Sequence, residues 1–100
     1  MIADDDPGIV DAIGLMLTFE GYRVSSTCRG SDVLRLNGDL PDLLLLDVQM
    51  PGEDGRDICR RFKANKHTRQ IPVIMISASL NVKTSALESG AVPNQTFSFV

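Results

Sequence analysis

The sequence predicts an α/β protein built on a doubly wound parallel sheet, and two observations indicate this fold. Apolar runs typical of strands alternate with segments whose apolar residues recur at helical spacing. Two of the runs, residues 42–48 and 71–79, are apolar on both faces, as expected for strands that helices cover on either side. Because single helices separate the strands, we expect parallel pairing through right-handed crossovers.

The individual elements follow from local signals. Asp6 and Pro7 are typical of a helix start, and Gly21 is typical of a helix end. Ser31 can cap a second, short helix that ends at Gly38. We expect strands at residues 1–3, 22–28, 42–48, 71–79 and 96–100, helices at residues 7–20, 32–37, 56–64 and 81–90, and a turn at residues 50–52.

Composition and charge fit a single domain in a reducing compartment. The chain has 100 residues, which leaves room for one core and not two. Its net charge of -3 gives no general attraction to nucleic acid or to an anionic membrane, and no apolar run approaches the length of a membrane span. The first residues lack the basic and apolar regions of a signal peptide, and Cys28 and Cys59 form no metal-binding spacing. We therefore expect a cytoplasmic protein that binds neither nucleic acid nor membrane.

Basic residues are concentrated in one part of the chain. Six of the ten fall within residues 56–69. A solvated helix face explains them better than a phosphate-binding patch, because Phe62 is the only aromatic residue beside them.

Acidic side chains follow two of the predicted strands. Asp4 and Asp5 come directly after residues 1–3, and Asp47 ends the apolar run that begins at Leu43. Ligands of an open parallel sheet bind at the carboxyl ends of its strands, so these acids can share one pocket if the two strands are neighbours. Three carboxylates at short range repel one another unless a cation joins them, and an all-oxygen site favours Mg²⁺.

This arrangement suggests a chemical role for Asp47. A carboxylate beside Mg²⁺ can attack a phosphoryl group, because the metal offsets the negative charge on both reacting groups. Ser77, at the end of the next strand, could donate a hydrogen bond to a phosphoryl oxygen. Each feature alone has a simpler explanation, since acids before a helix often cap it and Asp47 or Ser77 can be an ordinary strand end. Their conjunction favours the functional interpretation.

These segments resemble the receiver domain of bacterial two-component response regulators. "IADDDP" is similar to the acid pair of that family, "LLLLDVQMPGEDG" to its phosphoacceptor segment and "IPVIMISAS" to its hydroxyl-bearing strand. The resemblance implies a five-stranded sheet in the flavodoxin-like order 2-1-3-4-5, with Asp47 as phosphoacceptor and Ser77 as the switch hydroxyl. It also implies a Mg²⁺ site made by Asp4, Asp5, Asp47 and the backbone carbonyl of Gln49. The implied partner is a sensor histidine kinase or a phosphotransfer protein.

The C-terminal end departs from the family pattern. The lysine position of the family holds Phe97, its aromatic switch position Asn94 and its proline position Ser98. By resemblance, that lysine would pair with the phosphoryl group, so its replacement bears on signal propagation more than on metal binding. The first strand is short, and the fifth helix of the family is missing. We expect one receiver-like domain over residues 1–100, with an atypical end at residues 92–100.

These departures have a physical consequence. The first and fifth helices of such a fold together cover one face of the sheet, so Ile9, Ile13 and Leu17 should border an uncovered apolar patch. A domain of this size already buries a limited fraction of its surface. We therefore expect a shortened or altered chain, a homodimer, or marginal stability.

We expect a phosphorylatable signalling switch that is not an enzyme. Two other functions are alternatives to it. A degenerate receiver that binds proteins without phosphorylation would explain the missing lysine but not the intact acid cluster. A Mg²⁺-dependent phosphatase with an aspartyl nucleophile needs a second acid two residues later, where this chain has Gln49. A dinucleotide-binding fold fails because no G-x-G-x-x-G motif follows a strand.

Overall fold

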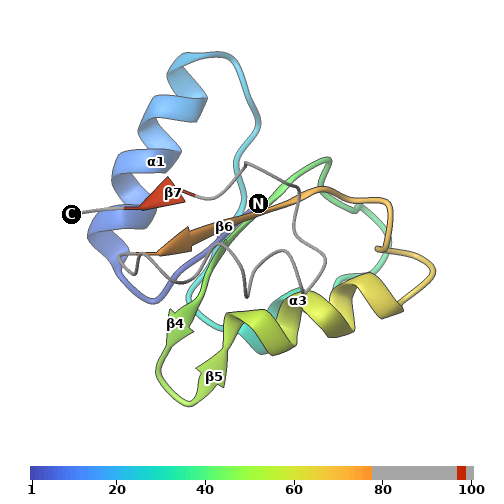
Figure 1. Ribbon diagram of the computed structural model, residues 1–100. Helices are drawn as coiled ribbons and strands as arrows, with labels where there is room; N and C mark the ends of the chain where they lie inside the picture. The colour runs from blue at the N-terminus through green and yellow to red at the C-terminus, as the bar shows by residue number, and fades with distance from the viewer. Residues whose placement is uncertain (78–96, 99–100) are drawn as a thin grey trace.

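The computed structural model describes residues 1–77 and 97–98, and it shows a sheet with helices on both faces. Helices α1 and α3 lie on opposite sides of the strands (Figure 1). The elements are β1 (Ile2–Ala3), α1 (Pro7–Phe19), β2 (Ser26–Thr27), α2 (Gly30–Val33), β3 (Leu44–Asp47), β4 (Gln49–Met50), β5 (Glu53–Asp54), α3 (Gly55–Ala64), β6 (Val73–Ser77) and β7 (Phe97–Ser98).

The main sheet is parallel and has the order β2-β1-β3-β6-β7. Numbered as the main strands occur along the chain, this is the predicted order 2-1-3-4-5. The short strand β1 is central, because it pairs with β2 on one side and with β3 on the other. In the register between β1 and β3, Ala3 lies opposite Leu46. The carboxyl end of β1 therefore lies beside the carboxyl end of β3, where Asp47 is found.

The strands contribute alternate residues to two apolar clusters, one on each face of the sheet. Leu44 and Leu46 of β3 belong to a cluster that includes Ile58 and Phe62 of α3. Leu45, between them, belongs to a second cluster that includes Ile13 of α1. This alternation follows from the two-residue period of a strand and explains why the run of leucines is buried on both faces.

Helix α1 begins and ends where the sequence predicts. The Asp6 side chain accepts a hydrogen bond from the backbone N–H of Gly8 at 2.9 Å, and Pro7 occupies the first helical position. At the other end, Gly21 has a φ of +94°. The N–H of Tyr22 donates to the carbonyl of Leu17, and that of Gly21 to Thr18, which together satisfy the last turn as in a Schellman motif.

The predicted apolar residues of α1 pack against the sheet. Ile13 is buried, and Ile9 and Leu17 are half-buried against the second cluster, so the expectation that they border an uncovered patch stays a prediction. The large apolar side chains that are exposed on α1 are Leu15, Met16 and Phe19. The expectations of a homodimer or of marginal stability stay predictions.

Strand β2 and helix α2 depart from the sequence-based expectations, whereas the turn lies where it is predicted. Strand β2 covers two residues and not residues 22–28, and α2 begins at Gly30, before the predicted cap at Ser31. The predicted turn at residues 50–52 closes a small antiparallel hairpin, in which Gln49 pairs with Asp54. Gly52 has a φ of +71°, which a residue without a side chain adopts freely. The predicted helix at residues 81–90 and the position Asn94 lie outside the described residues.

The basic segment at residues 56–69 covers most of α3 and the loop after it. Lys63 is half-buried, and its Nζ donates to the carbonyl oxygens of Arg69 at 3.2 Å and Ile71 at 2.6 Å, so it holds that loop to the helix. Arg61 lies 4.0 Å from Asp57, one turn away on the same helix. Among residues 1–77 and 97–98, the structure contains no helix with the length and apolarity that crossing a bilayer requires.

Close packing of α3 against the end of β3 generates a prediction. A Cβ at Gly55 would lie 2.7 Å from the Cα of Val48 and closer still to the carbonyl oxygen of Asp47. We expect Gly55→Ala to lower the free energy of unfolding by about 2 kcal/mol or more, because the backbone must shift to admit the methyl group. Urea unfolding followed by circular dichroism measures this.

The matched control is the same substitution in α1. Among the described residues, a Cβ at Gly14 would meet Val24 Cγ1 alone, at an ordinary 3.9 Å. Gly14→Ala should therefore stabilise the protein by about 0.5–1 kcal/mol through helix propensity. Equal effects of the two substitutions would contradict the close approach at Gly55.

Candidate metal centre

Three carboxylates from two adjacent strands meet at one end of the sheet. Asp4 and Asp5 directly follow β1, and Asp47 is the last residue of β3. Their carboxylate oxygens lie within 4.8 Å of one another. Asp4 is buried, Asp47 is half-buried and Asp5 is exposed, so the cluster reaches from the edge of the core to the surface. The parallel pairing of β1 with β3 produces this convergence.

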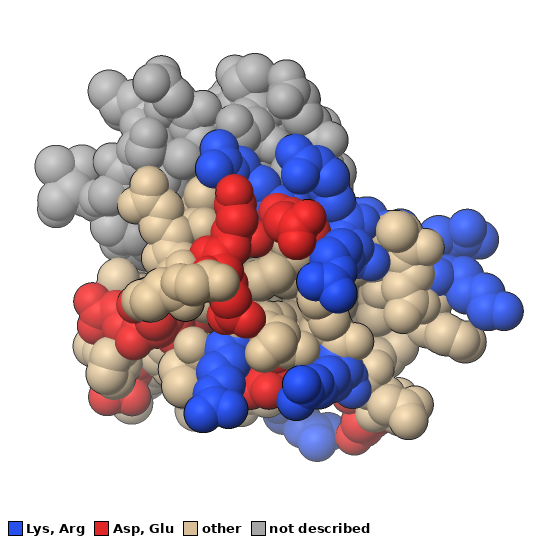
Figure 2. Space-filling model, turned by 90° about the horizontal axis from the view of Figure 1, so that it is seen from below, with Lys and Arg blue, Asp and Glu red and all other residues tan. Residues whose placement is uncertain are grey.

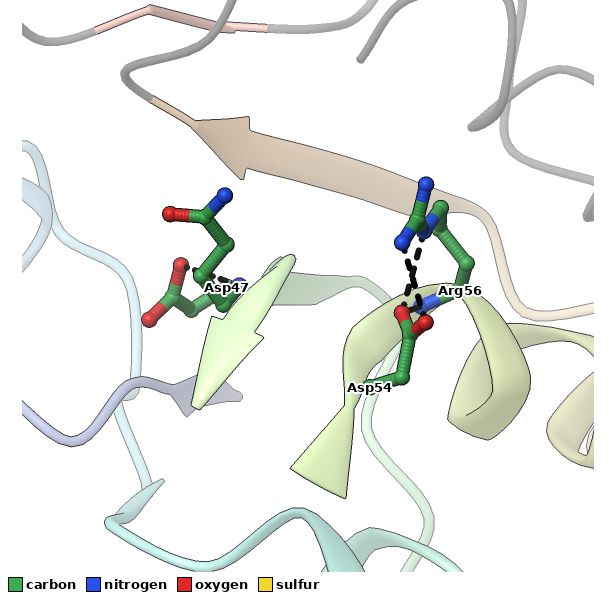
Figure 3. Close-up of polar contacts among 4 residues, drawn as sticks. Asp47, Asp54 and Arg56 are labelled. Carbon is green, nitrogen blue, oxygen red and sulfur yellow. Dashed lines mark hydrogen bonds and ion pairs between the residues drawn. The ribbon is translucent and has the colours of Figure 1, made fainter. Parts of the chain in front are cut away.

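Backbone hydrogen bonds hold two of the three carboxylates in place. The N–H of Asp6 donates to Asp4 Oδ1 at 2.9 Å. The N–H of Gln49 donates to Asp47 Oδ1 at 3.1 Å, as Figure 3 shows. Each of these bonds spans two residues, so the turn that follows the strand supplies the donor.

The electrostatics of the cluster favour protonation of Asp47. The pKa of Asp47 is raised to about 7, chiefly by burial and also by the charges of Asp4 and Asp5, against the opposing hydrogen bond from the Gln49 N–H. Burial also raises the pKa of Asp4. The ion pairs of Arg56 with Asp54 and of Arg61 with Asp57 lie outside the cluster. The three carboxylates therefore repel one another in the absence of a cation.

The donor set fits Mg²⁺. Carboxylate oxygens are hard ligands, and Mg²⁺ usually binds one or two protein carboxylates and keeps several waters. Here Asp5 is exposed enough to share such waters, whereas Asp4 is held in the core by its backbone bond. A divalent cation at this place would favour the ionised form of Asp47, against both the burial and the neighbouring charges that raise its pKa.

A cleft of about 450 Å³ opens beside the cluster. Asp5 and the β4–β5 hairpin line it, with Arg56 from the start of α3 at its side. Arg56 forms a bidentate ion pair with Asp54, in which Nε and Nη2 each donate at 3.0 Å (Figure 3). The same carboxylate caps α3 by accepting from the Arg56 N–H, and these bonds lower the pKa of Asp54. Acidic and basic side chains lie next to one another on the surface seen in Figure 2.

The structure brings together most of the residues that the sequence singles out. Asp4, Asp5 and Asp47 form one cluster, and Gln49 follows Asp47 in the adjoining hairpin. Ser77 ends β6, the neighbouring strand, where Asp47 lies opposite Ile76. The chemical roles assigned to these residues stay predictions.

Sequence reasoning missed the residues that support the site. Glu53, Asp54 and Gly55 follow the predicted turn, and no local pattern indicates that they contact distant backbone. An Asp directly before a helix is a recognisable cap, so Asp54 could have been found from its position. Glu53 accepts hydrogen bonds from backbone N–H groups more than twenty residues away, and only the folded chain brings these groups together.

The raised pKa of Asp47 predicts a pH dependence of stability. Between its ordinary value of 3.8 and about 7, folded Asp47 binds more protons than unfolded Asp47, so the free energy of unfolding contributed by this group falls as pH rises through that range. The Asp47→Asn variant has no titrating group at this position, so its free energy of unfolding does not show this decrease. We expect the substitution to stabilise the metal-free protein by about 1–2 kcal/mol near pH 8, a magnitude reduced for solvent screening, with little advantage near pH 4.

Unfolding followed by circular dichroism at several pH values checks this, since the chain contains no tryptophan. Adding Mg²⁺ near pH 8 should reduce the difference in free energy of unfolding between Asp47→Asn and the wild-type protein. The reason is that the cation stabilises the wild-type carboxylate more than the amide. Parallel pH profiles for the two proteins would contradict the raised pKa.

Comparison with known proteins places the chain in a family. Residues 1–93 match the model of the response regulator receiver domain. The response regulator PleD of Caulobacter vibrioides is 42% identical over 94 residues, which are 91% of this chain and 21% of PleD. The chain therefore spans about a fifth of the length of that relative.

Solved structures agree with this match. A response regulator from Chloroflexus aurantiacus has a TM-score of 0.88 and 31% identity, over 97% of this chain and 80% of that one. The receiver domain of a sensor histidine kinase from Pseudomonas aeruginosa, solved with a magnesium ion in its active site cleft, has a TM-score of 0.84 and 26% identity, with the same coverage. The chain belongs to the receiver domain family of two-component response regulators.

Proposed function

We propose that this chain is a phosphoacceptor signalling domain that receives a phosphoryl group on Asp47 with the help of Mg²⁺. The observation that carries the proposal is the convergence of Asp4, Asp5 and Asp47 within 4.8 Å at the carboxyl ends of β1 and β3. Asp47 is half-buried beside an open cleft, so an incoming phosphoryl group can reach it. Family membership and the magnesium of the Pseudomonas aeruginosa receiver support the same chemistry.

Each residue of the cluster has its own role in this proposal. Asp5 binds Mg²⁺ most directly, with Asp4, Asp47 and the backbone carbonyl of Gln49 completing the site. Bound Mg²⁺ supplies charge neutralisation for the attacking carboxylate and the phosphoryl oxygens. Ser77 donates a hydrogen bond to a phosphoryl oxygen and senses its arrival.

Phosphoryl transfer needs Asp47 in its ionised form. One of its carboxylate oxygens attacks phosphorus, the bond from phosphorus to the donor atom breaks, and the electron pair of that bond leaves with the donor. The hydrogen bond from the Gln49 N–H to Oδ1 orients the carboxylate for this attack. Because burial and neighbouring charges favour the protonated form, a cation in the cluster is what makes Asp47 reactive near neutral pH.

The donor in the proposal is a sensor histidine kinase or a phosphotransfer protein in the cytoplasm. Cys28 and Cys59 are free thiols, which is typical of a reducing compartment. In this proposal residues 1–100 form one receiver domain that can form a homodimer and makes no direct contact with nucleic acid or membrane. Phosphorylation-independent binding is the alternative, and Phe97 at the lysine position of the family is the feature in its favour.

Phosphorylation can be tested with a small phosphodonor. We expect acetyl phosphate and Mg²⁺ to add one phosphoryl group, detected as a mass increase of the intact protein. Asp47→Ala should abolish the increase, and chelation of Mg²⁺ should suppress it. Asp39→Ala, an exposed acid remote in sequence from the strand ends, is the matched control and should be labelled like wild type. No mass increase in the wild-type protein would favour phosphorylation-independent binding.

The metal assignment leads to a separate prediction. Asp5→Asn should weaken Mg²⁺ binding by about tenfold or more, because it removes a charged ligand from the cluster. Asp6→Asn is the matched control, since it removes one charge at the next position while asparagine still caps α1. Its Mg²⁺ affinity should stay within about threefold of wild type by isothermal titration calorimetry, because Asp6 is not a ligand. Equal losses in the two variants would show that only the net charge matters.

A further inference from the structure

Glu53 links the hairpin beside the site to the start of α2. Its carboxylate oxygens accept hydrogen bonds from two successive backbone N–H groups, from Gly30 to Oε2 at 2.7 Å and from Ser31 to Oε1 at 2.8 Å. The residue before α2, Arg29, makes no side-chain capping bond. Glu53 therefore satisfies the free N–H groups of this helix from 22 and 23 residues away, and its negative charge suits a helix N-terminus.

A glycine makes this contact possible. Gly30 is buried, and a Cβ at its position would lie 3.2 Å from Glu53 Oε2, 3.1 Å from Met50 Cε and much closer to Ile58 Cδ1. Because Gly30 has no side chain, the start of α2 packs closely against side chains of both the hairpin and α3. The contact is thus part of a tightly packed junction of three elements.

Helix α2 is itself attached to the sheet. Thr27 of β2 donates a hydrogen bond from Oγ1 to Asp32 Oδ2 of α2 at 2.6 Å. Val33 of α2 is buried in the apolar cluster that also contains Ile58. Glu53 therefore joins the hairpin to a fixed element of the core and not to a loose loop.

The other end of the hairpin adjoins the acid cluster. Glu53 pairs with Met50, and the next residue before Met50 is Gln49, whose N–H donates to Asp47 Oδ1. The N–H of Gly55 donates to the Val48 carbonyl at 2.9 Å and closes the base of the hairpin. A displacement of the hairpin would consequently move Gln49 relative to Asp47.

We propose that Glu53 is a positioning residue, whose carboxylate anchors the β4–β5 hairpin to α2 and thereby fixes the Gln49 backbone against the acid cluster. This inference rests on the proposed function, in which the Gln49 carbonyl is a Mg²⁺ ligand. Glu53 acts through the metal site and not on the phosphoryl group. Removal of the Glu53 carboxylate should therefore lower the Mg²⁺ affinity and leave the maximal rate of phosphorylation unchanged.

Substitutions of Glu53 test the proposal by Mg²⁺ titration and by the rate of labelling with acetyl phosphate. Glu53→Met removes both acceptor oxygens at similar length, and we expect Mg²⁺ affinity to fall about three- to tenfold, as for residues that orient a metal ligand. Saturating Mg²⁺ should restore the labelling rate to within about twofold of wild type, because Asp47 is intact. Glu53→Gln keeps one acceptor oxygen and should lie between wild type and Glu53→Met.

The matched control is Glu20→Gln, the same loss of charge at an exposed position at the end of α1. It should leave Mg²⁺ affinity and labelling unchanged. Wild-type affinity in Glu53→Met would overturn the proposal, and so would a labelling rate that stays low at saturating Mg²⁺. Unfolding curves of all variants establish that each is folded in the titration.

Amide hydrogen exchange tests the anchor without any metal, so the anchor and the proposed function can fail separately. In Glu53→Gln we expect faster exchange at Gly30, at Ser31 and also at Gln49, because the hairpin loosens as a unit. Faster exchange at Gly30 and Ser31 alone would overturn the positioning role, whether or not the protein binds Mg²⁺. Absence of Mg²⁺ binding by the wild-type protein, together with faster exchange at Gln49, would refute the proposed function and leave the anchor standing.

Discussion

Repulsion among three carboxylates that the sheet forces together is the constraint on which the site depends. The pairing of β1 with β3 brings Asp4, Asp5 and Asp47 together. Burial is the main cause of the raised pKa of Asp47, and the charges of Asp4 and Asp5 add an electrostatic cost to it. A binding site that is destabilised when empty is well suited to a ligand of opposite charge, because binding relieves the repulsion.

The packing around this cluster explains how so short a domain keeps it in place. Both faces of β3 are buried, so the strand cannot slide without moving Leu45 out of one cluster and Leu46 out of the other. Gly55 lets α3 approach the backbone at the end of β3, and Gly30 lets the start of α2 pack against side chains of the hairpin and of α3. Glycine at these places serves close approach and not flexibility, and rigid surroundings are what a positioned carboxylate needs.

The C-terminal strand of the sheet lies in the part of the chain that we expect to depart from the family pattern. Strand β7 pairs in parallel with the end of β6, so Phe97 lies opposite Ile76. The match to the family ends at residue 93, so the expectation that Phe97 takes the family's lysine position stays a prediction. In the proposed function, the phosphoryl group on Asp47 is stabilised by Mg²⁺ and Ser77 without help from a lysine at that position. We expect a phenylalanine in place of that lysine to affect signal output more than metal binding.

The fold class could be predicted from the sequence because its signals are local and periodic. The doubly apolar run ending in Asp47, the caps at Asp6 and Gly21 and the helical spacing of Ile58 and Phe62 are all readable within a few residues, and the structure confirms each of them. Strand lengths were less predictable. The segment at residues 22–28 has strand-like composition, but only the part opposite β1 finds a partner. Pairing, and not propensity, decides where a strand ends.

Some features of the candidate site could likewise be predicted from the sequence, and others depended on the tertiary structure. The sequence by itself determined that acids stand at the strand ends and that their carboxylates are hard, negatively charged oxygen ligands. Their convergence required β1 to lie beside β3, and the anchoring of the hairpin required Glu53 to meet Gly30 from a distant part of the chain. Contacts between residues far apart in sequence depend on how the packed elements approach one another, so only the tertiary structure could decide them.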